Sequence, residues 1–342
     1  MAMIVNGVKV CPTKVIVQGG GGDSGGAYLI KVIDYDGTVL KQDHLNTGDT
    51  FELPEPPTTH ERLTFQTWSS PLQITNNTIT VGKSDVTIGA VYTTKSGKNE
   101  YVIELTPITG LTISGIGNYG STIDWGDGNS QTARMQISHT YSDYGKYTIT
   151  CTSQIQINNV NSAKAFVGMY LGYVPRDISQ FGSTYIKEVS FPNSLITTSR
   201  CNLQSLSLKS FIIPPSCTNP NLPYGINLNS YNIEDIVIPY GVTSFTGNYL
   251  FYAVYSSLKV TFPSTITSIT QFFDIITDSS RTRSYNIEEL NFTEHTSVPT
   301  LGNSEGSFAF PRLKIRVPKS LESQWKSATN WSVYADYIVG VE

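Results

Sequence analysis

The histidines and cysteines are the residues most often used for metal binding and covalent chemistry, and here they lie far apart. The four histidines are His44, His60, His139 and His295. No two of them form an HxH or HExxH motif, so we expect no zinc centre. The four cysteines are Cys11, Cys151, Cys201 and Cys217. None forms a CxxC pair and four are too few for a disulfide scaffold, so we expect small buried hydrophobes or idle thiols.

Acidic residues give two further candidates for chemistry. Glu234-Asp235 and Glu288-Glu289 could supply the paired carboxyl groups of a glycosidase. Both pairs lie inside strand-like segments, so we expect them to face outward into solvent. A group at Asp124, Asp127 and Asn129 lacks the D-x-D-x-D-G spacing of a calcium loop. A structural turn is the favoured interpretation there, and a weak calcium site is the alternative.

Two short motifs resemble enzyme signatures without the context that chemistry needs. Gly22-Asp-Ser-Gly-Gly26 matches the nucleophile motif of trypsin-like proteases, whose His and Asp precede the Ser, whereas the first histidine here is His44. Gly115-Ile-Gly-Asn-Tyr-Gly120 satisfies GxGxxG, but a dinucleotide site needs a helix directly afterwards. The following Ser121–Trp125 favours a strand. We therefore expect a protein that is not an enzyme, with no catalytic residue, cofactor or metal.

Aromatic residues offer the remaining candidate site. A cluster lies between two predicted strands, at Tyr249, Phe251, Tyr252 and Tyr255. Tyrosine combines a large, rigid contact area with a polar tip, which makes it frequent at binding surfaces. We expect part of this cluster to be core and the rest to form a binding patch.

The composition indicates a mainly β protein of more than one domain. Of 342 residues, 15% are charged, against a typical value of about 25%, and there are 28 Gly, 17 Pro and 20 Tyr. This mixture suits short strands joined by turns and argues against helical bundles. The net charge of −4 gives no electrostatic footprint for nucleic acid. With no apolar run of about 18 residues and no signal-peptide pattern, we expect neither membrane insertion nor secretion.

The N-terminal segment is expected to be an attachment arm. Apolar runs in residues 4–17 flank Asn6-Gly7 and Cys11-Pro12, which predicts one or two short strand pairs. Six glycines in residues 19–26 then indicate a flexible linker. The predicted organisation therefore starts with an arm over 1–18 and a linker over 19–26.

Residues 27–95 resemble the internalin B-repeat family of small bacterial surface modules. The shared features are a strand with the turn Asp36-Gly37, then Gly48 and Phe51-Glu-Leu-Pro-Glu-Pro-Pro57, the pair Phe65 and Trp68, and Val86–Tyr92. The family's glycine between the Phe and the Trp is missing. This resemblance implies a β-grasp-like spacer or adhesion module without catalysis.

Residues 96–158 resemble a polycystic-kidney-disease (PKD) repeat, which is a seven-stranded immunoglobulin-like sandwich. The resemblance rests on Ile123-Asp-Trp-Gly-Asp-Gly128, His139-Thr-Tyr141 and Gly145–Thr150. The Phe of the family signature is absent, and Asp124 precedes Trp125. Gly126 and Gly128 permit the positive φ angles of a tight turn.

Residues 159–342 contain an internal repeat of the form apolar-x-x-apolar-x-apolar-Pro. The last position falls at residues 192, 214, 239, 263, 293 and 318, so the intervals are 22, 25, 24, 30 and 25 residues. Residue 293 is Thr instead of Pro, and the units that end at 263 and 318 are one residue short. Leucine-rich repeats have periods of about 20–29 residues. Each unit should contribute one strand, and stacked strands should bury Val189, Phe191, Phe211, Ile213, Ile236, Ile238, Val260, Phe262, Leu290, Phe292, Ile315 and Val317.

The repeat resembles bacterial-surface leucine-rich repeats, and a helix is expected to close it. Val242-Thr-Ser-Phe245 and Ile266-Thr-Ser-Ile269 match the second half of that family's consensus. Lys319–Thr329 is the best helix candidate in the chain and should cap the last repeat. The expected fold class is thus mainly β: a β-grasp-like module, an Ig-like sandwich and a short leucine-rich-repeat-like solenoid with a C-terminal helical cap.

All three resemblances are to extracellular recognition modules, yet the sequence shows no secretion signal. A bacteriophage virion protein would explain both, as a capsid decoration, head fibre or tail-associated fibre. Residues 1–18 would then bind other virion proteins, and the distal modules would bind a host-surface glycan or protein; assembly into a homo-oligomer stays open. The alternatives are a bacterial cell-surface adhesin and the accessory-module part of a carbohydrate-active enzyme.

Overall fold

The computed structural model is mainly β. It describes residues 26–153, 155–156, 160–172, 178–181, 186–194, 201–203, 208–218, 220, 233–245, 257–271, 287–303 and 312–342, together with two short strands near the N-terminus. None of the helices in these segments is long and apolar enough to cross a membrane. The linker over 19–25, the motif serine at position 24 and the aromatic cluster at 249–255 lie outside the described residues.

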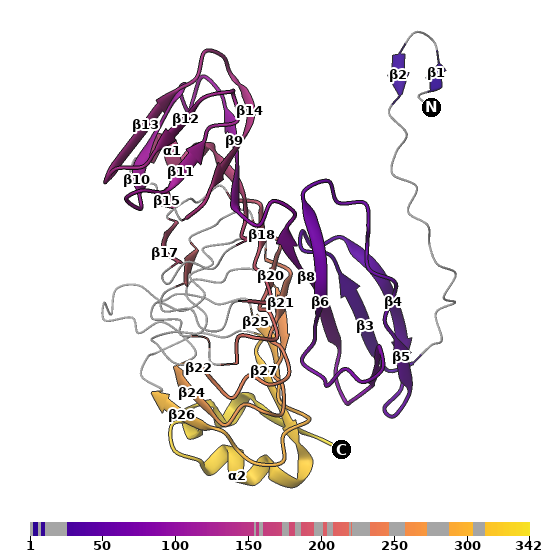
Figure 1. Ribbon diagram of the computed structural model, residues 1–342. Helices are drawn as coiled ribbons and strands as arrows, with labels where there is room; N and C mark the ends of the chain where they lie inside the picture. The colour runs from indigo at the N-terminus through magenta and orange to yellow at the C-terminus, as the bar shows by residue number, and fades with distance from the viewer. Residues whose placement is uncertain are drawn as a thin grey trace.

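The two N-terminal strands pair with each other. Strands β1 (Met3–Val5) and β2 (Val8–Val10) form an antiparallel hairpin in which Met3 faces Val10 and Val5 faces Val8. The predicted strand pair around Asn6-Gly7 is therefore confirmed. No other described strand pairs with this hairpin, which lies apart from the rest of the molecule in Figure 1.

The N-terminal module, residues 26–95, contains a four-stranded sheet in the order β4-β3-β8-β6 and a separate pair, β5-β7. Its strands are β3 (Tyr28–Ile33), β4 (Val39–Leu45), β5 (Thr50–Glu52), β6 (Leu63–Ser69), β7 (Thr78–Thr80) and β8 (Val86–Thr94). Strands β3 and β8 are parallel, and the other pairs are antiparallel. Ile30, Trp68 and Ile88 are buried in its core. The predicted turn at Gly37 has a φ of 85°, which favours glycine.

The second module, residues 96–158, has seven strands in its described part. These are β9 (Asn99–Leu105), β10 (Thr112–Gly117), β11 (Thr122–Asp124), β12 (Ser130–Thr132), β13 (Gln136–Thr140), β14 (Gly145–Cys151) and β15 (Ile155–Gln156). They belong to two sheets, with orders β13-β10-β15 and β12-β11-β14-β9. Tyr101, Ile113 and Trp125 are fully buried in its core. Helix α1 (Val160–Ala165) leads from this module into the next unit.

The C-terminal array, residues 159–342, consists of strands that pair in parallel and form two rows. One row contains β16 (Phe166–Tyr170), β18 (Glu188–Ser190), β20 (Ser210–Ile212), β21 (Asp235–Val237), β23 (Leu258–Thr261), β25 (Ile287–Asn291), β27 (Lys314–Pro318) and β28 (Ile338–Val341). The other row contains β17 (Ile178–Phe181), β19 (Cys201–Leu203), β22 (Ser244–Phe245), β24 (Ser268–Gln271) and β26 (Thr300–Asn303). All pairings recorded within each row are parallel.

The burial predicted for the repeat strands is confirmed. Each of the twelve apolar residues expected in the stacked core is buried, with Phe262 and Phe292 stacked at a centroid distance of 4.4 Å. The expected C-terminal helix is also present, as η1 (Lys319–Leu321) followed by α2 (Glu322–Ser327). A second 3-10 segment, η2 (Ser332–Tyr337), leads to β28. Trp325 and Trp331 of this cap are fully buried against the last strands.

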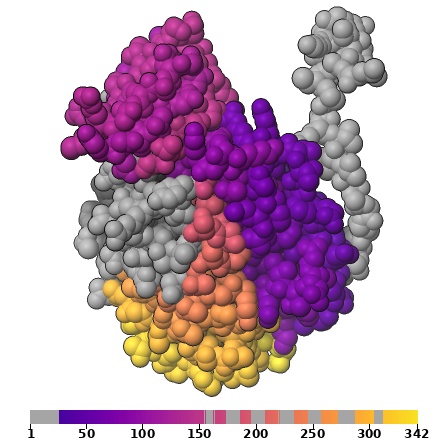
Figure 2. Space-filling view, viewed as in Figure 1, coloured from indigo at the N-terminus to yellow at the C-terminus, as the bar shows by residue number. Residues whose placement is uncertain are grey.

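The three units are packed together (Figures 1 and 2), and the second module and the array share one sheet. Strand β16 pairs antiparallel with β9 of the second module and parallel with β18 of the array, so one sheet crosses the expected boundary at residue 158. The N-terminal module lies against the array, where Ile33, Val91, Ile212 and Val237 form a small buried cluster. The chain therefore folds back on itself, and its three units form one compact body.

This packing corrects the expectation for the acidic pairs. Glu234 is exposed, as expected, but Asp235 is only 6% exposed and Glu289 only 9%. Asp235 is contacted by Lys31 and Thr87 of the N-terminal module, and Glu289 by Asn291 and Arg316 of the array. Each has a cationic partner: Lys31 Nζ lies 2.6 Å from Asp235, and Arg316 Nη1 lies 3.3 Å from Glu289.

Candidate binding cleft

Hydrogen bonds at the end of strand β6 fix the N-terminal module on the array. The Ser69 hydroxyl donates to the Ile213 carbonyl at 2.6 Å, and the Tyr240 backbone N–H donates to the Ser70 carbonyl at 2.6 Å. Ser69 is fully buried, so its bond satisfies a polar group that would otherwise be costly to bury. The end of β6 is therefore held at a defined position over the loops of the array.

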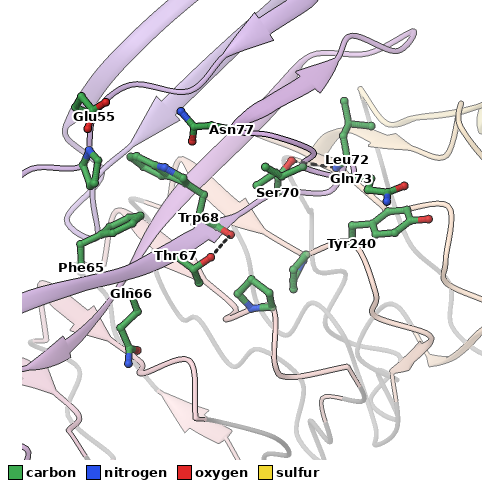
Figure 3. Close-up of a pocket in the computed structure, with 14 residues that line it drawn as sticks. Glu55, Phe65, Gln66, Thr67, Trp68, Ser70, Leu72, Gln73, Asn77 and Tyr240 are labelled. Atoms are coloured by element: carbon green, nitrogen blue, oxygen red, sulfur yellow. Dashed lines mark hydrogen bonds between the residues drawn. The ribbon is translucent and has the colours of Figure 1, made fainter.

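A cleft of about 770 Å³ opens beside these contacts (Figure 3). The N-terminal module supplies strand β6, the loop after it and the proline-rich segment before it, and the array supplies the opposite wall. The described lining residues are Glu55, Pro56, Phe65, Gln66, Thr67, Trp68, Ser70, Leu72, Gln73, Ile74, Asn77, Pro215, Pro239 and Tyr240. The site thus exists only because two units far apart in the sequence meet.

A β-bulge in strand β6 brings Phe65 and Trp68 to the same face. Residues three apart in a regular strand point to opposite faces of the sheet. Here Phe65 faces Tyr92 while Thr67 faces Val91, so Gln66 is an extra residue and the alternation is reset. The Phe65 and Trp68 rings consequently lie 4.9 Å apart between centroids, at an interplanar angle of 58°. The bulge therefore produces an aromatic corner at one end of the cleft.

Tyr240 lies at the other end of the cleft, on the array. It follows Pro239, the proline that ends one repeat unit, and precedes Gly241, whose φ of 100° turns the chain. The Tyr240 side chain is 38% exposed. In Figure 3 it lies beside Leu72 and Gln73, whereas Glu55, Phe65 and Trp68 gather at the opposite end. An aromatic ring is thus available at each end.

Three amide side chains among the described residues also line the cleft. The Gln66 Oε1 accepts a hydrogen bond from the Asn193 backbone N–H at 2.6 Å, which leaves its amino group as a donor. The Asn77 amino group donates to the Leu53 carbonyl at 3.0 Å, which leaves its Oδ1 as an acceptor. Gln73 is exposed at the rim. Among the described lining residues, Glu55 is the sole charged side chain.

The predicted turn at Asp124 to Asn129 is confirmed as a structural turn. Asp124 Oδ1 accepts from the Gly126 N–H at 2.9 Å, and Asp127 Oδ1 accepts from the Asn129 N–H at 3.0 Å. The other Asp127 oxygen lies 2.7 Å from His139 Nε2. Partial burial raises the pKa of Asp127, but the hydrogen bonds from His139 and Asn129 outweigh it and lower the pKa overall. These carboxylate oxygens are therefore engaged within the turn.

A second cavity, of about 260 Å³, lies where all three units meet. His60 Nε2 lies 2.8 Å from Asp34, and the Tyr170 hydroxyl donates to the Glu188 carboxylate. The Tyr35 ring packs edge-on against His60 at 5.3 Å. Burial, followed by the nearby carboxylates, raises the pKa of both Tyr35 and Tyr170, so the phenols stay protonated. The His60–Asp34 and Tyr170–Glu188 pairs therefore form a polar contact region between the units.

The remaining predicted sites are placed as follows. The candidate patch of Tyr249, Phe251, Tyr252 and Tyr255 falls outside the described residues, as do Cys11 and the side chain of Cys201. Cys151 and Cys217 are buried, as expected. Within the described segments, no three His, Cys, Asp or Glu side chains are arranged to hold a metal ion.

Sequence reasoning missed the cleft, although it noted several of its residues. Phe65 and Trp68 stood out in the B-repeat pattern, but nothing local indicated that Tyr240 would face them. The one available signal is that Tyr240 directly follows Pro239, the proline that ends a repeat strand. A residue at this position lies beyond the buried strand and is therefore outside the array core. A scan of protein-family models gives no match for this chain, and a search of curated proteins finds no significant relative.

Proposed function

We propose that this protein is a non-enzymatic adhesion protein of a bacteriophage virion and that the cleft binds a host-surface ligand. The observation that carries the proposal is the cleft itself, with an aromatic ring at each end and amide side chains among its lining residues. Concave sites that combine apolar walls with a few polar groups are the usual form of ligand sites. Residues 1–18 would attach the protein to other virion components.

The lining chemistry supports binding rather than turnover. General acid–base and nucleophilic mechanisms need at least two polar groups in mutual reach, such as a nucleophile with its base or two carboxyl groups. The described lining residues contain one carboxylate, Glu55, and no His, Lys or Cys. Amide groups and aromatic faces can hold a ligand but cannot readily exchange protons with it.

The finer fold assignments belong to the same proposal. The parallel β3-β8 pair flanked by antiparallel strands supports a β-grasp-like N-terminal module. The two sheets and seven described strands of the second module support a PKD-like or Ig-like sandwich. The two rows of parallel strands support a leucine-rich-repeat-like solenoid with a helical cap.

The binding function is tested by multivalent display on beads followed by a host-cell binding assay. Tyr240→Ala should reduce binding at least tenfold, because it removes a ring without removing the backbone bond to Ser70. Tyr119→Ala is the matched control, since that tyrosine is 86% exposed on the second module. Equal binding by the Tyr240 variant and the wild type would reject the cleft as the binding site. Hydrolase assays on the same surface polysaccharides should show no turnover.

The attachment function of the arm has a separate test. A lone two-stranded hairpin is at best marginally stable in water, so β1 and β2 should gain order against a partner. Deletion of residues 1–26 should abolish incorporation into particles while leaving cleft-dependent binding intact. Normal incorporation of the truncated protein would show that the arm is not the anchor.

A further inference from the structure

We infer that the ligand of the cleft is a neutral oligosaccharide spanning at least two sugar rings. This inference rests on the proposed function, because it names the chemical class that the binding cleft takes. It is carried by the placement of the aromatic rings, by the absence of cationic groups among the described lining residues, and by the dimensions of the cleft.

The aromatic rings suit sugars because a pyranose presents an apolar C–H face and a polar rim. The half-buried Phe65 and the 38% exposed Tyr240 offer ring surface to the cleft, while Trp68 packs against the Phe65 ring. A flat apolar face can pack on such a ring and bury area at little conformational cost, since aromatic side chains are rigid. Each end of the cleft can therefore hold one sugar ring.

The polar groups match the hydroxyls of a sugar. A hydroxyl both donates and accepts, so it is best satisfied by side chains that together offer both functions. The free amino group of Gln66 donates, the Oδ1 of Asn77 accepts, and the exposed Gln73 amide can do either. Hydrogen bonds of this kind also give a site its specificity, because a ligand without the matching group leaves them unpaired.

The charge of the cleft argues for a neutral ligand. An anion buried without a counter-charge carries a large desolvation cost. Among the described residues that line the cleft there is no lysine, arginine or histidine, and Glu55 adds a negative charge at the end that holds Phe65 and Trp68. Uronic acids, sialic acids and phosphate-bearing glycans would therefore be repelled, whereas uncharged hexoses and N-acetylhexosamines would not.

The volume sets the length of the ligand. About 770 Å³ lies within the range of about 300–1,000 Å³ that is usual for sites of small ligands. Tyr240 and the Phe65 corner lie at opposite ends of the cleft in Figure 3, so a ligand that contacts both must extend along the cleft. A proline-rich peptide is the other ligand that docks on aromatic grooves. The amides favour the sugar, and the peptide becomes an outcome of the test.

The test measures binding of the full-length protein to an array of neutral tetrasaccharides, including galactotetraose, cellotetraose and N-acetylchitotetraose. Tetragalacturonate and a decaproline peptide are the comparison probes. We expect binding to at least one neutral tetrasaccharide, at least tenfold weaker binding to the matching disaccharide, and no binding to tetragalacturonate. Tyr240→Ala should weaken binding of the neutral tetrasaccharide at least tenfold, and Gln73→Ala at least threefold. Tyr119→Ala should not change this binding.

The outcomes separate this inference from the proposed function. Binding to tetragalacturonate or decaproline alone would overturn the neutral-glycan assignment and leave the cleft as a binding site. The same conclusion would follow if no neutral tetrasaccharide bound while Tyr240→Ala still reduced host-cell binding. Host-cell binding that is unchanged in Tyr240→Ala would instead reject the proposed function itself. A circular dichroism melt that matches the wild type verifies that each variant is folded.

Discussion

At the scale of single residues, burial changes the pKa of a side chain from the value that is usual for its residue type. His295 follows the strand β25 and is 4% exposed, between the rings of Phe292 at 5.1 Å and Trp325 at 6.3 Å. Desolvation by burial lowers the pKa of His295 from 6.5 to about 4. The folded protein therefore holds a neutral imidazole at pH values where the unfolded chain would already be protonated. Nothing in the sequence around His295 distinguishes it from the half-buried His44.

This difference predicts a stability loss on the acid side. Because the pKa of His295 is lower in the folded state, its protonation does not affect stability above pH 6.5, and stability falls as the pH drops from 6.5 towards 4. The total loss from this group is about 3 kcal/mol in the free energy of unfolding. Urea denaturation at pH 7, 5.5 and 4 measures it. His295→Gln should flatten this decline and His44→Gln should not; an unchanged slope in His295→Gln would contradict the account.

At the scale of elements, the sequence predicted what depends on local pattern. The Pro-terminated repeat predicted buried positions such as Phe211 and Phe262, because alternation along a strand directly determines which side chains enter the core. The helix over Lys319–Thr329 and the turn at Asp124 were also predictable, since local hydrogen bonding and periodicity decide both. Strand β6 departs from the pattern, because its bulge at Gln66 is set by pairing with β8.

Contacts between elements could not be predicted, because single polar residues from distant positions make them. Ser69 and Ile213 are 144 residues apart, and Thr87 and Asp235 are 148 residues apart. No periodicity marks such residues, so Asp235 was expected in solvent and the cleft beside Tyr240 was not expected. The candidate site therefore depended on tertiary packing that neither repeat pattern nor family resemblance encodes.

At the scale of the whole molecule, the N-terminal module and the array should unfold cooperatively, because polar and apolar contacts join them. The Asp235 carboxylate on β21 binds Lys31 Nζ of β3 at 2.6 Å and accepts from the Thr87 hydroxyl of β8 at 3.1 Å. Lys259 Nζ lies 3.1 Å from Asp85, and the Thr261 hydroxyl donates to the Asp85 carbonyl at 2.8 Å. These bonds and the apolar cluster around Ile212 join the two units.

Removing the central carboxylate tests this coupling. Asp235→Ala leaves Lys31, which is 22% exposed, without its partner, so we expect a loss of about 2 kcal/mol in the free energy of unfolding. Differential scanning calorimetry should then resolve an earlier transition for the N-terminal module. Glu234→Ala is the control, because this neighbouring acid is exposed and should change stability by less than about 0.5 kcal/mol. A single unshifted transition in Asp235→Ala would show that the units are not coupled through this carboxylate.

The central claim, that the cleft between two units binds a host-surface ligand, is tested most directly by fluorine NMR of the full-length protein labelled with 5-fluorotryptophan. The chain has four tryptophans, and Trp68 lines the cleft while Trp125, Trp325 and Trp331 are fully buried elsewhere. Trp68→Phe assigns its resonance. Titration with host-surface polysaccharide should shift the Trp68 signal in a saturable way and leave the other three unchanged. A saturable shift of another tryptophan with no change at Trp68, or no shift at all, would contradict the account.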